Sequence, residues 1–261
     1  MSKEFIKEAF QKVLHNGDKA FVPYIMAGDG GLDQLEDQLL FLQESGATIV
    51  ELGVPFSDPV ADGPTIQKAG IRALAKGVSM KSILEKLESF KEKRGIPVVL
   101  MTYMNPIYAF GVEEFAFACK QSGVSGLIIP DLPLEEEDLI TPQLNENNIA
   151  LIRLASLTSP EDRLTEIAKR TEGFLYAVTV TGTTGARAEF KGNLKGHLHE
   201  LKKKCEVPVL AGFGVSTAEQ VKELGSYCDG VVVGSKIVDS LHQDKREDIL
   251  ELIHASKQSK V

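Results

Sequence analysis

Short runs of apolar residues, many of them β-branched, recur along the whole chain and alternate with longer amphipathic segments. Each run is only four or five residues long. That length is typical of a strand buried on both faces of a parallel sheet and too short for a helix. We expect eight such strands, at Phe21–Ile25, Thr48–Leu52, Pro97–Met101, Gly126–Ile129, Ala150–Leu154, Phe174–Val178, Pro208–Ala211 and Gly230–Val233.

The segments between these runs show the apolar spacing of amphipathic helices. We expect three of these helices to end in a glycine-containing turn, at Gly46, Gly123 and Gly225, because glycine readily adopts the left-handed conformation that stops a helix. The expected helices are Leu32–Glu44, Ile66–Lys76, Met80–Lys93, Glu113–Gln121, Glu135–Asn145, Pro160–Lys169 and Thr217–Leu224.

This alternation of strand and helix predicts a parallel sheet with right-handed crossovers. Eight such units in 261 residues favour one closed (β/α)8 barrel, a TIM barrel, over the alternative of an open doubly wound sheet. No low-complexity segment and no long linker divides the chain, so we expect residues 1–261 to form a single domain. In such a barrel the active site lies at the carboxyl ends of the strands.

Composition and charge narrow the range of partners. With 43% hydrophobic and 25% charged residues the chain has an ordinary globular composition, and its net charge of −8 argues against a nucleic-acid partner. The basic run 202–204 is expected to be a solvated helix end. No apolar stretch approaches the ~20 residues that cross a bilayer. The N-terminal segment also lacks the apolar core of a signal peptide, so we expect a cytoplasmic protein without membrane association.

The cysteines and histidines suggest no metal site. Cys119, Cys205 and Cys228 are widely spaced and form no metal or redox motif. No two of the five histidines have the four-residue spacing of a helical metal site. We therefore expect chemistry that needs no metal.

The segment Glu51–Gln67 carries the most informative chemistry. Glu51 lies at the end of the second expected strand, whereas Asp58 and Asp62 lie on the Pro- and Gly-rich loop that follows. Carboxyl groups in such different surroundings can have different pKa values, which allows one site to act as both acid and base. The alternative is a solvated acidic turn beside a structural glutamate.

Glycine clusters follow the last three expected strands, at 181–185, 212–216 and Gly234-Ser235. Glycine allows backbone N–H groups to approach an anion, and the N-terminus of a following helix adds positive potential. Phosphate sites in barrels are often built from the loops after strands 7 and 8. We predict a phosphate site of backbone donors with the Ser235 hydroxyl, and Lys236 pointing outward. Ordinary tight turns, which also favour glycine, are the alternative.

Four other residues have two interpretations each. Asp131 is either catalytic or orders a loop or helix start. Tyr176 either faces the barrel mouth or packs in the core. Tyr103 and Asn105 either hydrogen-bond to the loop after strand 2 or simply turn the chain. No expected strand contains the lysine of a Schiff-base aldolase, and no Ser-His-Asp arrangement is present, which leaves acid/base chemistry on a small phosphorylated substrate.

Taken together, these motifs resemble those of the tryptophan synthase α subunit family in order and approximate spacing over the whole chain. Such a long ordered set is far more specific than any single glycine motif. The matching segments are Phe21–Asp29, Glu51–Gln67, Pro130–Glu136, Gly182–Gly185, Gly212–Ser216 and Gly234-Ser235.

The resemblance implies a (β/α)8 barrel that cleaves indole-3-glycerol phosphate reversibly to indole and glyceraldehyde 3-phosphate, a retro-aldol step of tryptophan biosynthesis. By similarity Glu51 protonates the indole C3 and then takes the proton of the glyceryl hydroxyl. Asp62 would interact with the indole N–H. Burial at the strand end should raise the pKa of Glu51, whereas Asp62, on a wetter loop, should stay ionised.

The resemblance also implies the remaining site residues. The phosphate would be bound by Gly185, Gly212, Phe213, Gly214, Gly234 and Ser235. Tyr176 corresponds to a tyrosine near the catalytic glutamate, and Thr184 to a residue on the loop after strand 6 that orders the loop after strand 2. The apolar indole slot would comprise Tyr24, Met101, Ile128 and Leu154.

The family works as an α2β2 complex in which the β subunit holds pyridoxal phosphate, so we expect no cofactor in this chain. Candidates for the surface that faces the β subunit are Pro55, Phe56, Asp58, Asn105 and Pro133. Two other functions stay open: a phosphosugar isomerase or related barrel enzyme that shares the phosphate site, and an inactive barrel that only activates a β partner.

Overall fold

The computed structural model describes residues 2–156, 158–179, 194–212 and 214–257. Eight parallel strands form a closed barrel in sequence order, because β1 pairs with β2 on one side and with β8 on the other. The prediction of a closed barrel is therefore confirmed, and the open sheet is wrong. The strands are β1 (Ala20–Met26), β2 (Val50–Gly53), β3 (Val98–Met101), β4 (Gly126–Ile128), β5 (Ala150–Ser156), β6 (Leu175–Val178), β7 (Val209–Gly212) and β8 (Gly230–Val233).

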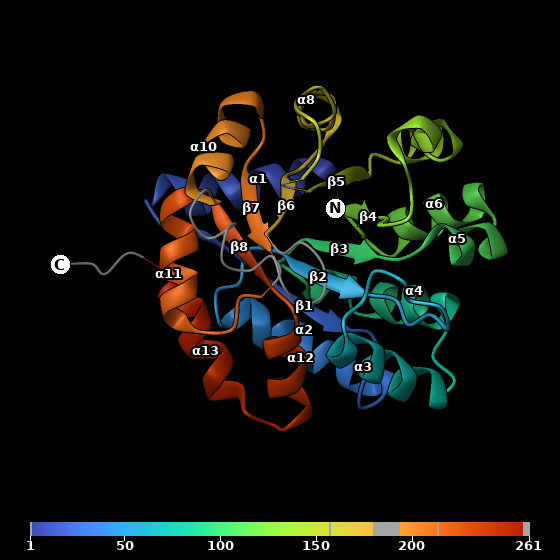
Figure 1. Ribbon diagram of the computed structural model, residues 1–261. Coiled ribbons are helices and arrows are strands. Elements are labelled where there is room, and N and C mark those ends of the chain that lie inside the picture. The colour runs from blue at the N-terminus through green and yellow to red at the C-terminus, as the bar shows by residue number, and fades with distance from the viewer. Residues whose placement is uncertain (1, 157, 180–193, 213, 258–261) are drawn as a thin grey trace.

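Helices surround this barrel, as Figure 1 shows. Within the described residues the α-helices are α1 (Lys3–His15), α2 (Leu35–Glu44), α3 (Pro64–Ala75), α4 (Met80–Ser89), α5 (Met104–Phe110), α6 (Val112–Gln121), α7 (Thr141–Glu146), α8 (Glu161–Arg170), α10 (Leu194–Lys204), α11 (Ala218–Tyr227), α12 (Ser235–His242) and α13 (Arg246–Ala255). Short 3-10 turns are η1 (Leu32–Gln34), η2 (Lys91–Lys93) and η3 (Leu134–Leu139). None of the helices described is long and apolar enough to cross a membrane.

Local signals explain where several helices begin and end. Ser79 and Thr217 form capping boxes that satisfy the first backbone N–H groups of α4 and α11. Gly46 and Gly123 have φ values of 89° and 71°, which confirms them as left-handed stops after α2 and α6.

The prediction for Gly225 is wrong, because it lies inside α11, which continues to Tyr227. A Cβ at this glycine would lie 3.3 Å from Cγ of Lys19, so the glycine allows close packing instead of ending the helix. Helix α5 was also not expected, since its seven residues are too short to show a clear helical period.

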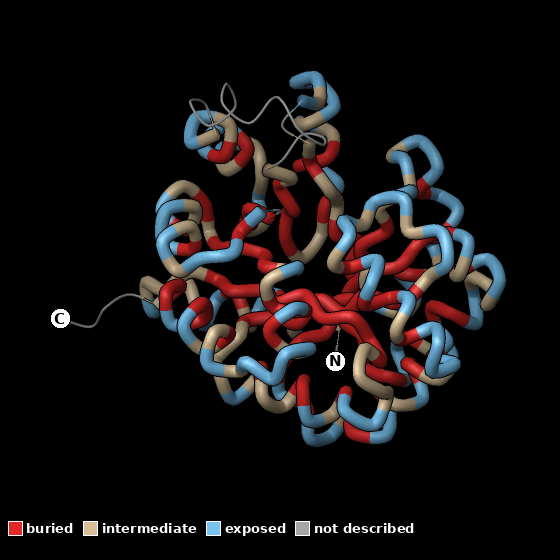
Figure 2. The backbone as a smooth tube through the Cα atoms, turned by 60° about the horizontal axis from the view of Figure 1, so that its bottom comes forward, coloured by how far each residue is buried: buried red, intermediate tan, exposed pale blue. Residues whose placement is uncertain are grey.

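The interior of the barrel is filled by buried apolar side chains from seven of the strands and by Ile49, which directly precedes β2. Ile6 and Phe10 of α1 join this cluster, and the Phe10 ring lies 5.7 Å from that of Phe174. Helix α1 therefore closes the end of the barrel at which the strands begin. Figure 2 shows buried residues along the barrel and exposed residues on its outer rim. Among the residues that the structure describes, this leaves the face where the strands end as the open end of the barrel.

Candidate active site

Glu51 lies in the middle of β2 with its side chain inside the barrel. It pairs in register with Tyr24 of β1 and Val99 of β3, and it is only 1% exposed. Its Oε2 atom has no hydrogen-bond partner among the described residues. A buried, unsatisfied carboxyl oxygen is costly for stability, so this arrangement is typical of a functional site.

A cavity of about 290 Å³ opens at the carboxyl ends of the strands above Glu51. This is close to the lower end of the usual range for small-molecule pockets. Its walls come from β1, β2, β3, β5 and β6, from the loops after β2, β7 and β8, and from the first turns of α3 and α12. The lining residues are Tyr24, Glu51, Ala61, Asp62, Gly63, Ile66, Met101, Leu154, Tyr176, Gly214, Val215, Ser216, Gly234, Ser235 and Lys236.

Two strand-end glycines make room for the tyrosines of this cavity. A Cβ at Gly53 would lie 1.9 Å from the Tyr24 hydroxyl oxygen, and one at Gly212 would lie 2.4 Å from Cε1 of Tyr176. Both distances are far below contact, so only glycine allows the two rings to lean across neighbouring strands. Tyr176 lines the cavity and is also buried, with 6% of its surface exposed. It therefore faces the barrel mouth and packs in the core at the same time.

Burial raises the pKa values of the two cavity carboxyl groups by different amounts. It raises the pKa of Glu51 to about 8, with a further contribution from the charge of Asp62. Desolvation also raises the pKa of Asp62, to about 6, although a hydrogen bond from Tyr103 opposes the increase. Asp62 is half-buried and most of its loop is exposed, so its surroundings are wetter than those of Glu51, as expected. Near pH 7 the pair consists mainly of a neutral Glu51 and an ionised Asp62.

Tyr103 anchors the loop that carries Asp62. Its hydroxyl accepts a hydrogen bond from the Ala61 backbone N–H at 3.1 Å and hydrogen-bonds to the Asp62 carboxylate. The Phe56 ring packs against that of Tyr103, with centroids 5.4 Å apart. Of the two interpretations of Tyr103, the structure supports hydrogen bonding to the loop after β2. Asn105 instead lies exposed in α5.

The rim of the cavity carries part of the predicted anion site. Gly214 has a φ of 79°, and Gly234 and Ser235 lie where α12 begins, so the free backbone N–H groups of that helix end face the rim. Lys236 lines the cavity, which was not expected, but its Nζ lies 2.6 Å from Asp248 of α13. Because Asp248 already neutralises Lys236, the backbone N–H groups at the rim are the main groups that can bind an anion.

Some predicted site residues are not on the cavity wall. Ile128 is fully buried in the barrel interior, and Gly212 supports Tyr176 from behind, so neither lines the cavity described here. Thr184, Gly185 and Phe213 lie outside the described residues.

The predicted partner-facing residues also require one correction. Pro55 is buried, because it directly follows β2, and it cannot contribute to an exposed surface. Asp58, Asn105 and Pro133 are exposed, and Phe56 is partly exposed.

Asp131 lies outside the cavity, at the start of α5. Its carboxylate accepts hydrogen bonds from the Met104 backbone N–H, at 3.0 and 3.2 Å, and so caps the start of α5. It does not line the cavity above Glu51. Of its two interpretations, the structure supports the ordering of a helix start.

Sequence reasoning missed several cavity residues, among them Ala61, Gly63, Ile66, Val215 and Ser216. Each lies within a motif that was recognised, either Glu51–Gln67 or Gly212–Ser216, and Ile66 lies in the first turn of α3. Their membership in those motifs was the available signal. Which of them face the cavity depends on the path of each loop, and no local pattern specifies that path.

Comparison with known proteins gives one consistent result. A family model described as tryptophan synthase alpha chain matches residues 10–260. The tryptophan synthase alpha chain of Bacillus mycoides is 53% identical over 259 residues, which cover 99% of each chain. That of Bacillus anthracis is 54% identical over 258 residues, covering 99% of this chain and 98% of its own.

Solved structures agree with these sequence relatives. Tryptophan synthase subunit alpha from Legionella pneumophila superposes with a TM-score of 0.86 at 31% identity, covering 98% of each chain. A chain of Mycobacterium tuberculosis tryptophan synthase gives a TM-score of 0.88 at 33% identity, covering 97% of this chain and 98% of its own.

Proposed function

The chain belongs to the tryptophan synthase alpha chain family, and from this premise we propose which of its residues carry out the family's reaction. The protein is a carbon–carbon lyase of tryptophan biosynthesis that cleaves indole-3-glycerol phosphate to indole and glyceraldehyde 3-phosphate. The single observation that carries the residue assignment is that a buried carboxyl group and an ionised carboxylate line one cavity with a helix N-terminus at its rim.

We assign the proton transfers to Glu51. In its neutral form it donates its proton to C3 of the indole ring, which converts the ring into a cationic iminium and makes it a leaving group. The Glu51 carboxylate then takes the proton of the glyceryl hydroxyl next to the ring. As the aldehyde forms, the C–C bond breaks and its electron pair returns to the indole. The proton given to C3 stays on the product, and Glu51 ends protonated, as it began.

Asp62 stabilises the charged intermediate. Its carboxylate accepts a hydrogen bond from the indole N–H, which grows stronger as the ring becomes positive. Its pKa of about 6 keeps it ionised near pH 7, while the pKa of about 8 keeps the proton on Glu51. Each carboxyl group therefore starts in the form that its step requires.

The substrate fits the cavity in one orientation. Tyr24, Met101 and Leu154 provide apolar surface for the indole ring. The phosphate would lie at the rim, where Gly234, Ser235 and the start of α12 supply N–H donors and a hydroxyl. The phosphate assignments of Gly185 and Phe213 and the loop-ordering assignment of Thr184 rest on family resemblance alone.

The family name implies a complex with a β subunit, and we propose the α2β2 stoichiometry. In this proposal pyridoxal phosphate belongs to the β subunit, and the two proton transfers above use only side chains of this chain. The proposed partner-facing residues are exposed or partly exposed: Phe56, Asp58 and Pro133 lie on loops, and Asn105 lies at the start of α5.

The test is an assay of indole release from indole-3-glycerol phosphate, with and without a β subunit. Glu51→Gln and Asp62→Asn should each lower kcat by at least about 100-fold with little change in KM, since each removes an interaction that acts mainly in the transition state. Glu44→Gln, an exposed charge change on α2, is the control and should behave as wild type.

The outcomes separate the alternatives. Full activity in either cavity variant would refute the assigned roles, and isomerisation of a phosphosugar without indole release would favour the related barrel enzyme. Stimulation of a β subunit by a chain that releases no indole itself would identify a pure activator.

A further inference from the structure

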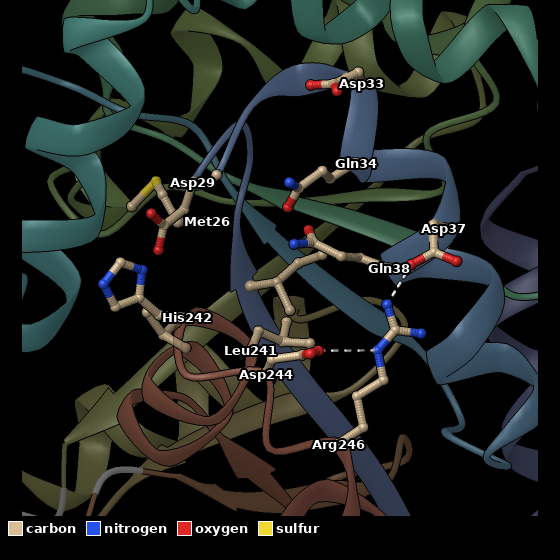
Figure 3. A pocket seen from close by; sticks show the side chains of 13 residues that line it. Met26, Asp29, Asp33, Gln34, Asp37, Gln38, Leu241, His242, Asp244 and Arg246 are labelled. Atoms are coloured by element: carbon tan, nitrogen blue, oxygen red, sulfur yellow. Dashed lines mark hydrogen bonds and ion pairs between the residues drawn. The ribbon is translucent and has the colours of Figure 1, made fainter.

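Tyr24 is the last side chain of β1 that lines the active-site cavity. The next two residues, Ile25 and Met26, instead line a separate cavity of about 630 Å³ outside the barrel. Figure 3 shows Met26 on the wall of this outer cavity. Tyr24 is therefore the contribution of β1 to the active site. The mechanism above uses its ring as apolar surface and leaves its hydroxyl without a role.

The Tyr24 side chain runs along the cavity wall from the anion rim to the carboxyl groups. Its Cβ and Cγ lie 3.8 and 4.0 Å from the point where a Cβ of Gly234 would be, so the ring begins beside the rim. Its hydroxyl lies at the other end, 1.9 Å from the point where a Cβ of Gly53 would be. Gly53 comes two positions after Glu51 and shares its face of β2. The hydroxyl therefore reaches β2 at the level directly above Glu51.

The Tyr24 hydroxyl is a donor that faces the substrate space. It forms no hydrogen bond to a described residue, whereas the Tyr103 hydroxyl binds the loop that carries Asp62. Burial, followed by the charges of Asp62 and Glu51, raises the pKa of Tyr24 well above its usual value, so the phenol keeps its proton. Since Tyr24 is only 5% exposed, a bound substrate removes the remaining water from the hydroxyl. Binding is then weakened unless the substrate supplies a hydrogen-bond partner.

The substrate has one polar group that the proposed binding mode leaves without a partner. Its phosphate lies at the rim, its indole N–H binds Asp62, and the hydroxyl next to the ring gives its proton to Glu51. The hydroxyl of the middle glyceryl carbon lies between these ends, along the wall that Tyr24 forms. A hydroxyl oxygen accepts hydrogen bonds as well as donating one, so it matches a phenol donor.

We propose that the Tyr24 hydroxyl donates a hydrogen bond to the hydroxyl of the middle glyceryl carbon and thereby selects substrates that carry this group. The inference rests on the proposed function, because it concerns the same cavity and the same substrate. No bond to this hydroxyl forms or breaks in the reaction, so the contact stabilises the bound substrate and the transition state alike. Its loss should therefore appear mainly in KM.

The test compares two substrates in the indole-release assay. One is indole-3-glycerol phosphate, and the other is its analogue with hydrogen in place of the middle glyceryl hydroxyl. The wild type should have a kcat/KM about tenfold lower for the deoxy analogue. Tyr24→Phe keeps the ring and loses the hydroxyl. It should lower kcat/KM for the full substrate about tenfold, mainly through KM, without lowering that for the analogue, because both changes remove the same hydrogen bond.

Tyr108→Phe, at an exposed tyrosine of α5, is the matched control and should leave both kcat/KM values unchanged. Undiminished turnover of the analogue by Tyr24→Phe verifies that this variant is folded and that Glu51 and Asp62 stay in place.

Two results would overturn this inference and leave the proposed function intact. The first is a wild type that cleaves the two substrates equally well. The second is a Tyr24→Phe variant whose kcat/KM falls equally for both, which would show that Tyr24 acts through its ring or through the carboxyl groups. A wild type that releases no indole from indole-3-glycerol phosphate would refute the proposed function, and this inference with it.

Discussion

At the scale of single residues, the active site depends on two carboxyl groups that burial affects to different degrees. Glu51 is enclosed by the barrel, and its pKa rises to about 8; Asp62 lies half-buried under Tyr103, and its pKa rises to about 6. Near neutral pH one of these two carboxyl groups is thus a proton donor and the other is an anion. The difference arises from the amount of water that each group retains and from the hydrogen bond that Tyr103 provides.

These pKa values predict the pH dependence of catalysis. Since activity needs a protonated Glu51 and an ionised Asp62, kcat/KM should be bell-shaped, with apparent pKa values of about 6 and about 8. Tyr103→Phe removes the hydrogen bond that lowers the pKa of Asp62, so the acidic limb should move to higher pH. Tyr108→Phe, at an exposed tyrosine of α5, serves as the control. An acidic limb that does not move in Tyr103→Phe would contradict this assignment.

The buried carboxyl group also predicts a pH-dependent stability. The pKa of Glu51 is about 8 in the folded state and near 4.5 when unfolded. Between these values only the unfolded chain releases the proton, so the wild type loses stability as the pH rises through this window. Glu51→Gln lacks this loss. It should match the wild type below pH 4.5 and exceed its free energy of unfolding by up to about 5 kcal/mol at pH 9.

Urea denaturation of both proteins at several pH values measures this difference. A constant difference between Glu51→Gln and wild type from pH 5 to pH 9 would show that the pKa of Glu51 is not raised by folding.

At the scale of elements, the barrel depends on close approach between neighbouring strands. Gly230 begins β8, and a Cβ there would lie 2.3 Å from the Ala20 backbone oxygen of β1. This is where the first and last strands meet to close the barrel. Gly53 and Gly212 provide similar space, but for tyrosine side chains of the active site instead of backbone.

Gly230→Ala should therefore be severely destabilising. Backbone atoms cannot move aside as a flexible side chain can, so we expect a loss of about 3 kcal/mol or more in the free energy of unfolding. Gly63→Ala is the matched control: a Cβ there meets nothing within 4 Å, and its φ of −75° suits alanine. Its effect should stay within about 1 kcal/mol. Similar urea midpoints for the two variants would refute the argument.

At the scale of the whole molecule, α1 closes one end of the barrel and the loops after the strands form the other. The open end carries the cavity with Glu51 and the exposed residues of the loop after β2. On this loop Val60 is 84% exposed, an unusual position for an apolar residue next to a predicted partner contact, Asp58. We infer that the partner covers it.

Val60→Ser should weaken association with a β subunit by about three- to tenfold, because the apolar burial of one valine is lost. The folded chain alone should keep its stability. Phe117→Ser, on α6, changes another exposed apolar residue outside this loop and should not affect association. Titration calorimetry measures both variants, and equal affinities would exclude Val60 from the interface.

Much of this molecule was determined by the sequence alone. The eight strands follow from short apolar runs, and their barrel follows from the alternation with helices. The position of Glu51 on the second strand and the glycines at the rim were likewise readable, although the strand continues to Gly53 instead of ending at Glu51. Such features depend on neighbours in the chain, and hydrophobic period and turn chemistry encode them locally.

Only the tertiary structure decided the contacts between distant segments. The hydrogen bond between Tyr103 and the loop of Asp62, the capping of α5 by Asp131 and the burial of Pro55 all depend on how the closed barrel brings separate loops together. Local patterns specify which residues are buried or turn the chain, whereas closure of the barrel specifies which of them meet.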